Sequence, residues 1–285
     1  CCNLLTLDAA VNCGFGCSYC TIQSFYDEGR IFLHRDLDKA LERIEIDPEL
    51  TYHIGTGQSS DSLMWGNTDG LLEELFRFAR ERPRVILELK TKSANIGYLL
   101  DNPPPANVLV TWTLNSRQVI DFEEHGTASL DERLEAAARV AAAGSLVGFH
   151  LHPMVPHLCW EEAYGELFSR LLSDFDPARV AMVSLGTLTF IKPVIRAIRE
   201  RGEKTQVLRL PLTETAGKFS YPEEIKRQLF RFAYTALAPW HRKVFFYLCM
   251  EPPQLWEPVF GFSYRDNESF EAAMKSAYLE KIRAE

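Results

Sequence analysis

Three cysteines near the start of the chain are the residues best suited to chemistry. Cys13, Cys17 and Cys20 have the spacing C-x3-C-x2-C, and Gly14 and Gly16 let the backbone between them turn sharply. A loop this short can point three thiolates at one small object. Iron–sulfur clusters are held by cysteine thiolates, usually four of them, so three cysteines would leave one iron open for a ligand from outside the protein.

Zinc is the competing interpretation of the same three cysteines. Structural zinc sites normally use four ligands, often as two separated C-x2-C pairs, and this sequence has no second pair. Free cysteine is also a common core residue. A non-catalytic protein that binds zinc or a cluster through these cysteines is therefore an alternative to an enzyme, and metal content would separate the two.

The composition is that of a soluble globular protein. The chain has 285 residues, 46% of them hydrophobic and 25% charged, which is enough for one large α/β barrel or two ordinary domains. We find no apolar run of the ~18 residues that a membrane span needs, and no signal peptide. Seven cysteines, three of them clustered, suit a reducing compartment. We therefore expect a cytoplasmic protein with no membrane partner.

The charge balance disfavours a protein that coats nucleic acid. There are 39 acidic and 31 basic side chains, and the formal net charge is −8. A local basic groove is still open, because Arg196, Arg199, Arg201 and Lys204 cluster on one predicted helix and its exit. A solvated helix face would show the same pattern. DNA is thus a partner that overall charge does not favour and a local groove would permit.

Predicted strands and helices alternate along most of the chain. Apolar periodicity predicts strands at 50–54, 85–89, 108–114, 147–152 and 180–185, and helices at 36–44, 71–81, 130–143, 160–174 and 192–201. Such alternation means parallel strands joined by right-handed crossovers, in a doubly wound sheet or a barrel. In both architectures the chemistry gathers at the carboxyl ends of the strands.

The C-terminal part departs from this rhythm. From Val207 onward we predict a helix at 221–236, a strand at 243–249 and a helix at 269–283. We expect residues 1–205 to form the barrel and residues 206–285 to form an extension that packs on it or closes it. Cys1 and Cys2 are expected in the core, at the start of the first strand.

Polar residues stand at the ends of successive predicted strands. They are the segment 55–62 with its glycines and hydroxyls, Lys90 and Lys92, the segment 115–117, and the histidines His150 and His152. Polar and basic groups placed this way suit a barrel mouth that holds an anionic ligand. The two histidines could instead bind metal together with His157, or simply face a substrate.

The cysteine motif, with Tyr19 just before the third cysteine, resembles the signature of radical SAM enzymes. The likeness extends to one family among them, the spore photoproduct lyases, which repair a thymine dimer in spore DNA, and it covers roughly residues 11–235. The segments that carry it are Asn115-Ser-Arg-Gln-Val-Ile, Gly126-Thr-Ala-Ser, the stretch from Arg133 to Gly144 and Trp160-Glu-Glu-Ala-Tyr-Gly-Glu-Leu-Phe.

The resemblance implies a partial (β/α)6 TIM-like barrel of the radical SAM type, here with a C-terminal α/β extension. It implies that Cys13, Cys17 and Cys20 hold a [4Fe-4S] cluster whose open iron binds S-adenosylmethionine (SAM). An electron, from a reductant such as flavodoxin or ferredoxin, then cleaves SAM to methionine and a 5′-deoxyadenosyl radical that takes a hydrogen atom from substrate. The positions that resemble SAM contacts are Tyr19, Ser60, Lys92 and Ser116, with Asp61 in the same loop as Ser60.

Two departures from that family affect the expected reaction. The position that aligns with the lyase's hydrogen-donating cysteine is Gln58, and the tyrosine expected after the third cluster cysteine is Thr21. A substitute donor could be Cys249, at the end of a predicted strand, or Tyr19. The sequence therefore predicts hydrogen abstraction from an unidentified small-molecule or nucleotide-derived substrate, with thymine-dimer repair in DNA through a substitute donor as an alternative.

Overall fold

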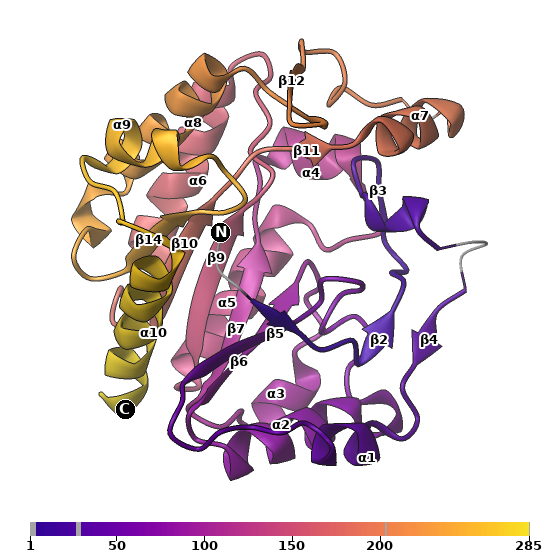
Figure 1. Ribbon diagram of the computed structural model, residues 1–285, viewed down its shortest axis with the longest axis vertical. Helices are drawn as coiled ribbons and strands as arrows, with labels where there is room; N and C mark the ends of the chain where they lie inside the picture. The colour runs from indigo at the N-terminus through magenta and orange to yellow at the C-terminus, as the bar shows by residue number, and fades with distance from the viewer. Residues whose placement is uncertain (1–3, 27–29, 203, 285) are drawn as a thin grey trace.

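A curled sheet of seven parallel strands forms the centre of the molecule (Figure 1). The computed structural model describes residues 4–26, 30–202 and 204–284, so Cys1 and Cys2 lie outside the described residues. In spatial order the strands are β1 (Leu5–Thr6), β5 (Tyr52–Thr56), β6 (Val85–Thr91), β7 (Val108–Thr113), β9 (Leu146–Leu151), β10 (Val180–Leu185) and β14 (Phe245–Leu248). Every neighbouring pair is parallel.

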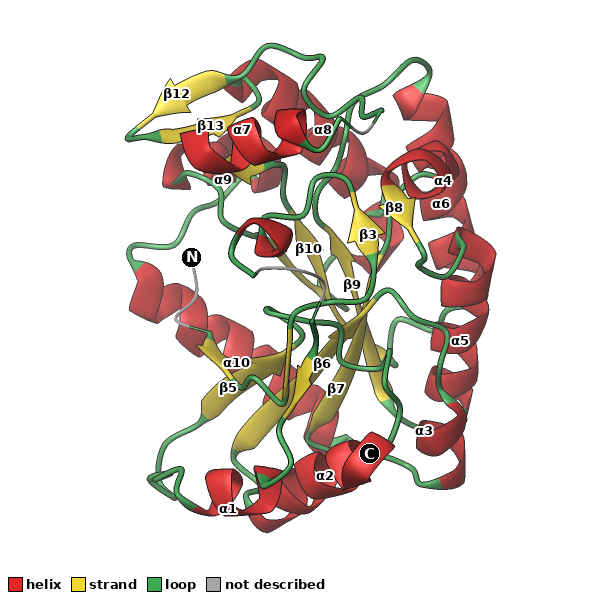
Figure 2. Ribbon diagram, turned by 90° about the vertical axis from the view of Figure 1, so that its right-hand side faces the viewer, coloured by secondary structure: helices red, strands yellow, loops and turns green. Residues whose placement is uncertain are grey.

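Helices lie outside the curled strands (Figure 2). They are α1 (Leu37–Glu42), α2 (Leu71–Glu81), α3 (Gly97–Asp101), α4 (Arg117–Glu123), α5 (Leu130–Ala142), α6 (Trp160–Asp174), α7 (Lys192–Glu200), α8 (Glu223–Ala236), α9 (Trp256–Phe260) and α10 (Asn267–Arg283). Short 3₁₀ turns are η1 (Ile22–Ser24), η2 (Thr68–Gly70), η3 (Ala238–Trp240) and η4 (Pro253–Leu255). No helix in the described part of the chain combines the length and the apolar character that crossing a bilayer requires.

Three small antiparallel sheets stand apart from the central one. β2 (Ala10–Val11) pairs with β4 (Phe32–Leu33), β3 (Gly16–Cys17) pairs with β8 (Glu124–His125), and β13 (Lys218–Ser220) lies between β11 (Thr189–Phe190) and β12 (Thr213–Thr215). The β3–β8 pair is the one that fixes the cysteines, because it joins their loop to the segment after α4.

The central strands are buried on both faces, as parallel strands covered by helices should be. All six residues of β7, β9 and β10 are buried. Val, Leu and Ile dominate these strands, and branched side chains pack well on a pleated surface. A few polar residues also point into the curled sheet, among them Glu88, Thr111, His150 and Ser184, which bond to one another. The barrel interior is therefore a packed core with a polar layer in it.

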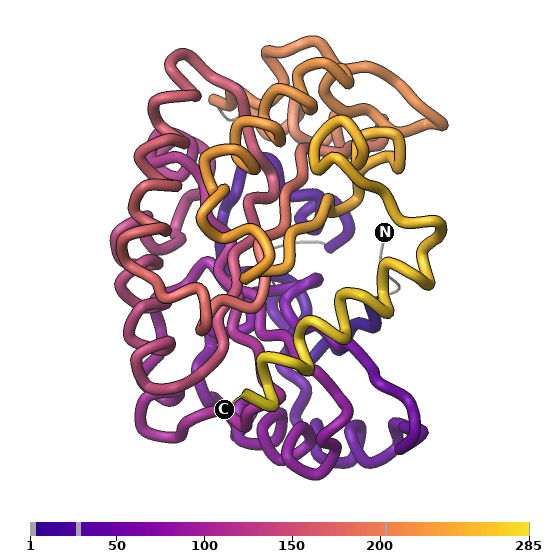
Figure 3. Tube along the Cα trace, turned by 90° about the vertical axis from the view of Figure 1, so that its left-hand side faces the viewer, coloured from indigo at the N-terminus to yellow at the C-terminus, as the bar shows by residue number. Residues whose placement is uncertain are grey.

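Helix α10 lies across the open side of the curled sheet, where its two edges do not pair. Tyr278 on α10 packs edge-on against His53 of β5, with ring centroids 5.6 Å apart, and against Phe245 of β14, 6.1 Å away. Figure 3 shows α10, in yellow, running diagonally between the purple N-terminal part and the orange C-terminal part. A helix thus bridges the strands on either side of the gap.

The predicted fold class, a partial barrel of the radical SAM type, is confirmed. The strand at 180–185 and the helices at 71–81 and 160–174 have the predicted bounds. The strand predicted at 50–54 lies two residues later, since Leu50 is exposed and pairing to β6 begins at Tyr52. The strand predicted at 85–89 continues to Thr91, because Lys90 and Thr91 still pair with β7.

We expect replacement of Tyr278 by alanine to lower the free energy of unfolding by about 3 to 5 kcal/mol, the usual cost of removing a large buried ring. Urea denaturation followed by circular dichroism measures it. Ser276→Ala, an exposed position on the same helix, is the matched control and should change stability by less than about 0.5 kcal/mol. A loss below about 1 kcal/mol for Tyr278→Ala would show that α10 does not brace the sheet.

Candidate active site

One cavity at the carboxyl ends of the parallel strands brings most of the predicted site residues together. Its volume is about 320 Å³. The cysteine loop, defined here as residues 13–20, supplies one wall. The remaining lining comes from residues 21–22, 57–61, 90–92 and 187–190 and from Thr113, His152, Pro153 and Met250. All central strands from β5 to β14 thus contribute residues at or just after their ends.

Two adjacent carboxylates hold the cysteine loop in place. Ser18 Oγ donates to the Glu123 carboxylate, and Ser18 N donates to the Glu123 carbonyl oxygen over 2.8 Å. Tyr19 Oη donates to the Glu124 carboxylate. The β3–β8 pairing places Cys17 opposite Glu124. The two residues directly after Cys17 are therefore fixed by buried charged acceptors, which fixes the course of the chain toward the third cysteine.

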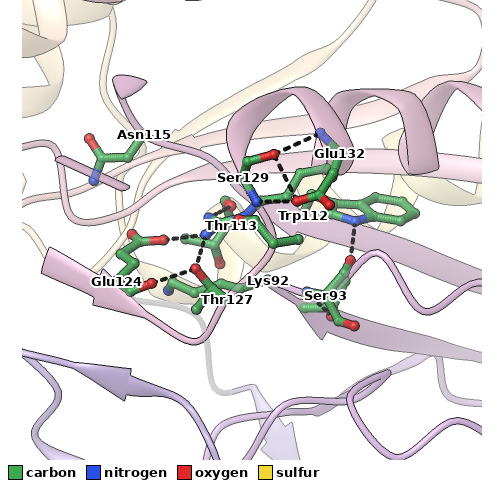
Figure 4. A network of polar contacts seen from close by, with 12 residues as sticks. Lys92, Ser93, Trp112, Thr113, Asn115, Glu124, Thr127, Ser129 and Glu132 are labelled. Atoms are coloured by element: carbon green, nitrogen blue, oxygen red, sulfur yellow. Dashed lines mark hydrogen bonds and ion pairs between the residues drawn. The ribbon is translucent and has the colours of Figure 1, made fainter. Parts of the chain in front are cut away.

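Glu124 is in turn held by a buried network at the ends of β6 and β7 (Figure 4). The Arg133 guanidinium lies 2.6 Å from Glu124 Oε2, and neither side chain is exposed to solvent. Arg133 also donates to the Thr113 carbonyl oxygen over 2.9 Å and to Thr127 Oγ1 over 2.6 Å. Burial opposes ionisation of Glu124, but Lys92 and Arg133 hold its pKa below the usual value. The loop is thereby tied to the rim of the barrel.

Asp61 positions Lys92 and the chain that follows β5. Its carboxylate accepts hydrogen bonds from Lys92 N (2.6 Å), Thr91 Oγ1 (2.7 Å), Met64 N (2.9 Å) and Leu63 N (3.0 Å). Burial nevertheless raises the pKa of Asp61. Although Asp61 lines the cavity, its oxygens are engaged by the protein itself, so its clear task is to fix the cavity wall.

Lys92 and Ser60 present polar groups to the cavity. Lys92 Nζ lies 5.7 Å from the centre of the Tyr19 ring, a cation–π distance. Ser60 Oγ is buried and has no hydrogen-bond partner among the described residues. Leaving a buried hydroxyl unpaired costs about 1 to 3 kcal/mol. The Ser60 hydroxyl is therefore a hydrogen-bonding group of the cavity wall that the described part of the protein does not itself satisfy.

The donor set of the cysteine loop fits a cluster better than a single ion. Burial raises the pKa of Cys13 to about 11 and raises that of Cys17 further, and each thiol also feels the charge of Cys20. Because thiolate is the ligand, binding of metal must release these protons. Within the described residues, no three His, Cys, Asp or Glu side chains converge on one point as a single ion would require. All three thiols line the one cavity, so a cluster held by them would lie in its wall.

Two of the predicted site residues do not line the cavity. Ser116 caps helix α4, where its Oγ accepts from Val119 N, and it lies 2.9 Å from His157 Nε2. Cys249 N donates to the Leu185 carbonyl oxygen over 2.7 Å, and the cavity is lined by the next residue, Met250. The structure therefore does not bring Ser116 and Cys249 together with the other predicted site residues, and their roles stay predictions.

The predicted alternative of a three-histidine metal site is not supported by the arrangement of the rings. Both ring nitrogens of His150 are hydrogen-bonded, Nε2 to Glu88 over 2.5 Å and Nδ1 to Ser184 over 2.6 Å. His157 is engaged by Ser116 and by the Leu158 carbonyl oxygen. The structure instead places His150 in the polar layer beneath the cavity.

Sequence reasoning missed the residues that hold the cysteine loop, Glu123, Glu124 and Arg133. Nothing in their spacing points to Ser18 and Tyr19, which lie 105 positions earlier. One signal was present, since Arg133 occupies a position on the buried face of α5 beside Leu134. A charged residue there indicates a buried ion pair.

Comparison with known proteins agrees with this fold. The family model described as spore photoproduct lyase matches residues 5–225. A spore photoproduct lyase from Geobacillus sp. (strain Y412MC61) is 30% identical over 220 residues, which are 74% of this chain and 63% of that protein. The chain thus spans less than two thirds of that relative's length.

Two solved structures show the same fold at 24% identity, each covering 86% of this chain and 76% of the other. Spore photoproduct lyase complexed with dinucleoside spore photoproduct has a TM-score of 0.74. A mutant of that enzyme with bound AdoMet and dinucleoside spore photoproduct has a TM-score of 0.71. The fold is thus the partial barrel of radical SAM proteins. Within that class, the match of the family model over most of the sequence shows that the chain belongs to the spore photoproduct lyase family.

His152 should make the free energy of unfolding depend on pH. Burial, followed by the charges of Lys90, His150 and Lys92, lowers the pKa of His152 to about 3. Below pH ~6.5, His152 therefore binds a proton in the unfolded chain but not in the folded chain. The contribution of His152 to the free energy of unfolding is complete above that pH and is lost as the pH drops.

We expect His152→Gln to flatten the fall in unfolding free energy between about pH 6 and 4 by up to ~1.4 kcal/mol per pH unit, the value for one proton. Urea denaturation at a series of pH values measures the slope. The exposed His34→Gln is the control for loss of a histidine. An unchanged slope in His152→Gln would mean that this ring accepts its proton in the folded state.

Proposed function

We propose that this protein is a radical SAM enzyme whose reaction takes place in the cavity at the barrel rim. The observation that carries the proposal is the meeting of Cys13, Cys17 and Cys20 with the unpaired Ser60 hydroxyl and the Lys92 ammonium around one space. The family and the AdoMet-bound relative of the same fold support it.

In this proposal the three cysteines hold a [4Fe-4S] cluster and the polar wall opposite holds SAM. With an electron from a reductant such as flavodoxin or ferredoxin, the bound cluster would supply the reductive cleavage of SAM to methionine and a 5′-deoxyadenosyl radical. Ser60 offers a hydroxyl to SAM, and Lys92 offers a positive charge to its carboxylate. Tyr19 closes the wall beside Lys92, and Asp61 keeps Lys92 in position through its backbone.

The substrate that family membership favours is a thymine-dimer lesion of the spore-photoproduct type. The sequence alone left the substrate unidentified. The relative whose structure contains dinucleoside spore photoproduct supports a substrate of that kind. The cavity volume of about 320 Å³ lies at the lower end of ligand pockets, which span roughly 300 to 1,000 Å³. A flipped dinucleotide would therefore enter only with its reactive end, the rest remaining outside.

The return of a hydrogen atom to the substrate must differ from the route expected for the family. Gln58 lines the cavity where a thiol would stand, and its amide nitrogen, in the orientation that satisfies its neighbours, donates to the carbonyl oxygens of Gly55 (3.0 Å) and Thr56 (3.1 Å). Thr21 also lines the cavity, but Cys249 does not. Tyr19 lines the cavity, so we assign it as the donor; its phenolic O–H must then leave the Glu124 carboxylate to reach the substrate.

Reconstituted protein should carry about four irons and should form 5′-deoxyadenosine from SAM under dithionite, since three thiolates hold a cluster with an open iron. Cys17→Ala should abolish both. Cys159→Ala, a change at an exposed cysteine outside the cavity, is the matched control and should leave iron content and cleavage unchanged. A single tightly bound zinc without SAM cleavage would overturn the proposal.

The choice of donor is tested with dinucleoside spore photoproduct in deuterated water. An O–D or S–D donor returns deuterium to the repaired thymine, whereas direct return from 5′-deoxyadenosine does not. Tyr19→Phe keeps the ring beside Lys92 but removes the bond to Glu124, so the readout is deuterated product per 5′-deoxyadenosine formed, which should fall at least tenfold in protein whose iron content matches the parent. Cys249→Ala should change neither this ratio nor the iron content. If deuterium incorporation is lost in Cys249→Ala and kept in Tyr19→Phe, the assignment is wrong.

A further inference from the structure

A second hollow lies between helix α7 and the segment 208–212, next to the lining of the active-site cavity. Its volume is about 870 Å³, and residue Phe219 of β13 also lines it. We call it the α7 groove. Four cations, Lys192, Arg196, Arg199 and Arg209, line it together with a single carboxylate, that of Glu200. On a chain of formal net charge −8, this is a locally basic surface.

Two of the four cations are available for a partner. Arg196 Nε lies 2.7 Å from Glu200, and Lys192 Nζ lies 3.9 Å from Glu214, both exposed pairs of the kind that stabilise little. Arg199 and Arg209 are exposed and form no ion pair within the described part of the chain. The basic helix face recognised in the sequence is therefore not neutralised by the fold.

The floor of the α7 groove is apolar. Leu208, Leu210 and Phe219 are half-buried there, and Lys192 Nζ lies 5.7 Å from the centre of the Phe219 ring. Cations alternating with an aromatic and aliphatic floor suit a nucleic-acid strand, whose phosphates pair with the cations and whose bases lie on the apolar surface. An acidic protein would use the cations and leave this floor idle.

The α7 groove and the active-site cavity are lined by neighbouring residues of one small sheet. Phe190 of β11 lines the cavity, and its cross-strand partner Phe219 of β13 lines the groove. The end of α7 is also fastened to the cysteine loop region, because Arg201 donates to Ser18 O over 2.7 Å and to Gln23 Oε1 over 2.8 Å. A DNA strand bound in the groove would therefore lie beside the cavity, next to the paired strands β11 and β13.

We propose that the α7 groove binds the phosphodiester backbone of the DNA strand that carries the lesion, beside the nucleotides presented to the cavity. This inference rests on the proposed substrate. The negative net charge of the chain does not oppose this binding, because the contacts come from a local set of cations on a chain that is acidic elsewhere. A dinucleoside, which has no flanking phosphates, would not use the groove.

The test compares two double variants that remove the same charge, using the reconstituted protein. Arg199→Gln/Arg209→Gln empties the groove of its unpaired cations. Arg43→Gln/Arg80→Gln, at exposed arginines of the α1–α2 end, is the matched control, and Figure 1 shows that end far from α7. Fluorescence anisotropy with a thymine-rich oligonucleotide, single-stranded and duplex, measures the dissociation constant at several salt concentrations.

We expect the groove variant to raise the dissociation constant roughly tenfold or more at ~0.1 M salt and to lower the salt slope by about 1.4 to 1.8, the value for two phosphate contacts. Turnover of free dinucleoside photoproduct should stay as in the parent. The control variant should retain DNA affinity. Wild-type protein that binds DNA through the groove yet does not repair the dinucleoside would support the groove and overturn the proposed substrate.

Three results would overturn the groove assignment. The first is unchanged DNA affinity in the groove variant. The second is an equal loss in both double variants, which would show diffuse electrostatic binding. The third is unchanged DNA affinity combined with lost turnover under flavodoxin but not under dithionite, which would identify the groove as the dock for an acidic electron donor.

Discussion

The site depends on the buried ion pair between Glu124 and Arg133. Both side chains are fully buried, and removal of one partner would leave an uncompensated charge, which costs about 3 to 5 kcal/mol. Through this pair the cysteine loop is tied to β7, because Glu124 holds Tyr19 and Arg133 holds the Thr113 carbonyl oxygen. A cluster needs ligands fixed to within about 0.5 Å. Here directional bonds to charge, not hydrophobic packing alone, set that position.

The cationic side chains of the cavity lie in its wall, above the buried polar layer of the sheet. Glu88 is surrounded by His53, His150 and Thr111; burial opposes its ionisation, yet the two histidines hold its pKa well below the usual value. His152 stays uncharged, and Asp61 is enclosed by its four donors. The cationic groups that line the cavity are then Lys90 and Lys92. A carboxylate or a phosphate is the ligand such a wall favours.

Much of the fold follows from sequence, whereas the support of the site does not. Apolar strands of β-branched residues alternating with amphipathic helices can only pair in parallel, which is why β10 and α6 have the predicted bounds. The cysteine spacing likewise predicts the ligands of a cluster. The grip of Glu123 and Glu124 on Ser18 and Tyr19 joins residues 105 positions apart, and only topology brings them together. Ser116 shows the converse, because a serine that looks like a ligand contact also makes a good helix cap.

Gln58 has a structural task at the position where the family resemblance predicts a hydrogen-donating cysteine. The turn after β5 cannot move to make room, since a Cβ at Gly57 would lie 2.6 Å from the Lys90 carbonyl oxygen. The Gln58 amide uses this rigid turn, bonding to the carbonyl oxygens of Gly55 and Thr56, so position 58 serves structure. The cavity wall then offers two kinds of group that could give a hydrogen atom. They are the thiols of the cysteine loop and the O–H groups of serines, threonines and Tyr19. A phenol gives up its hydrogen atom far more readily than an aliphatic alcohol, because the aromatic ring delocalises the radical left on oxygen. The Tyr19 hydroxyl also bonds to Glu124, so the hydrogen atom that Tyr19 would give to the substrate belongs to the same O–H that fixes the cysteine loop.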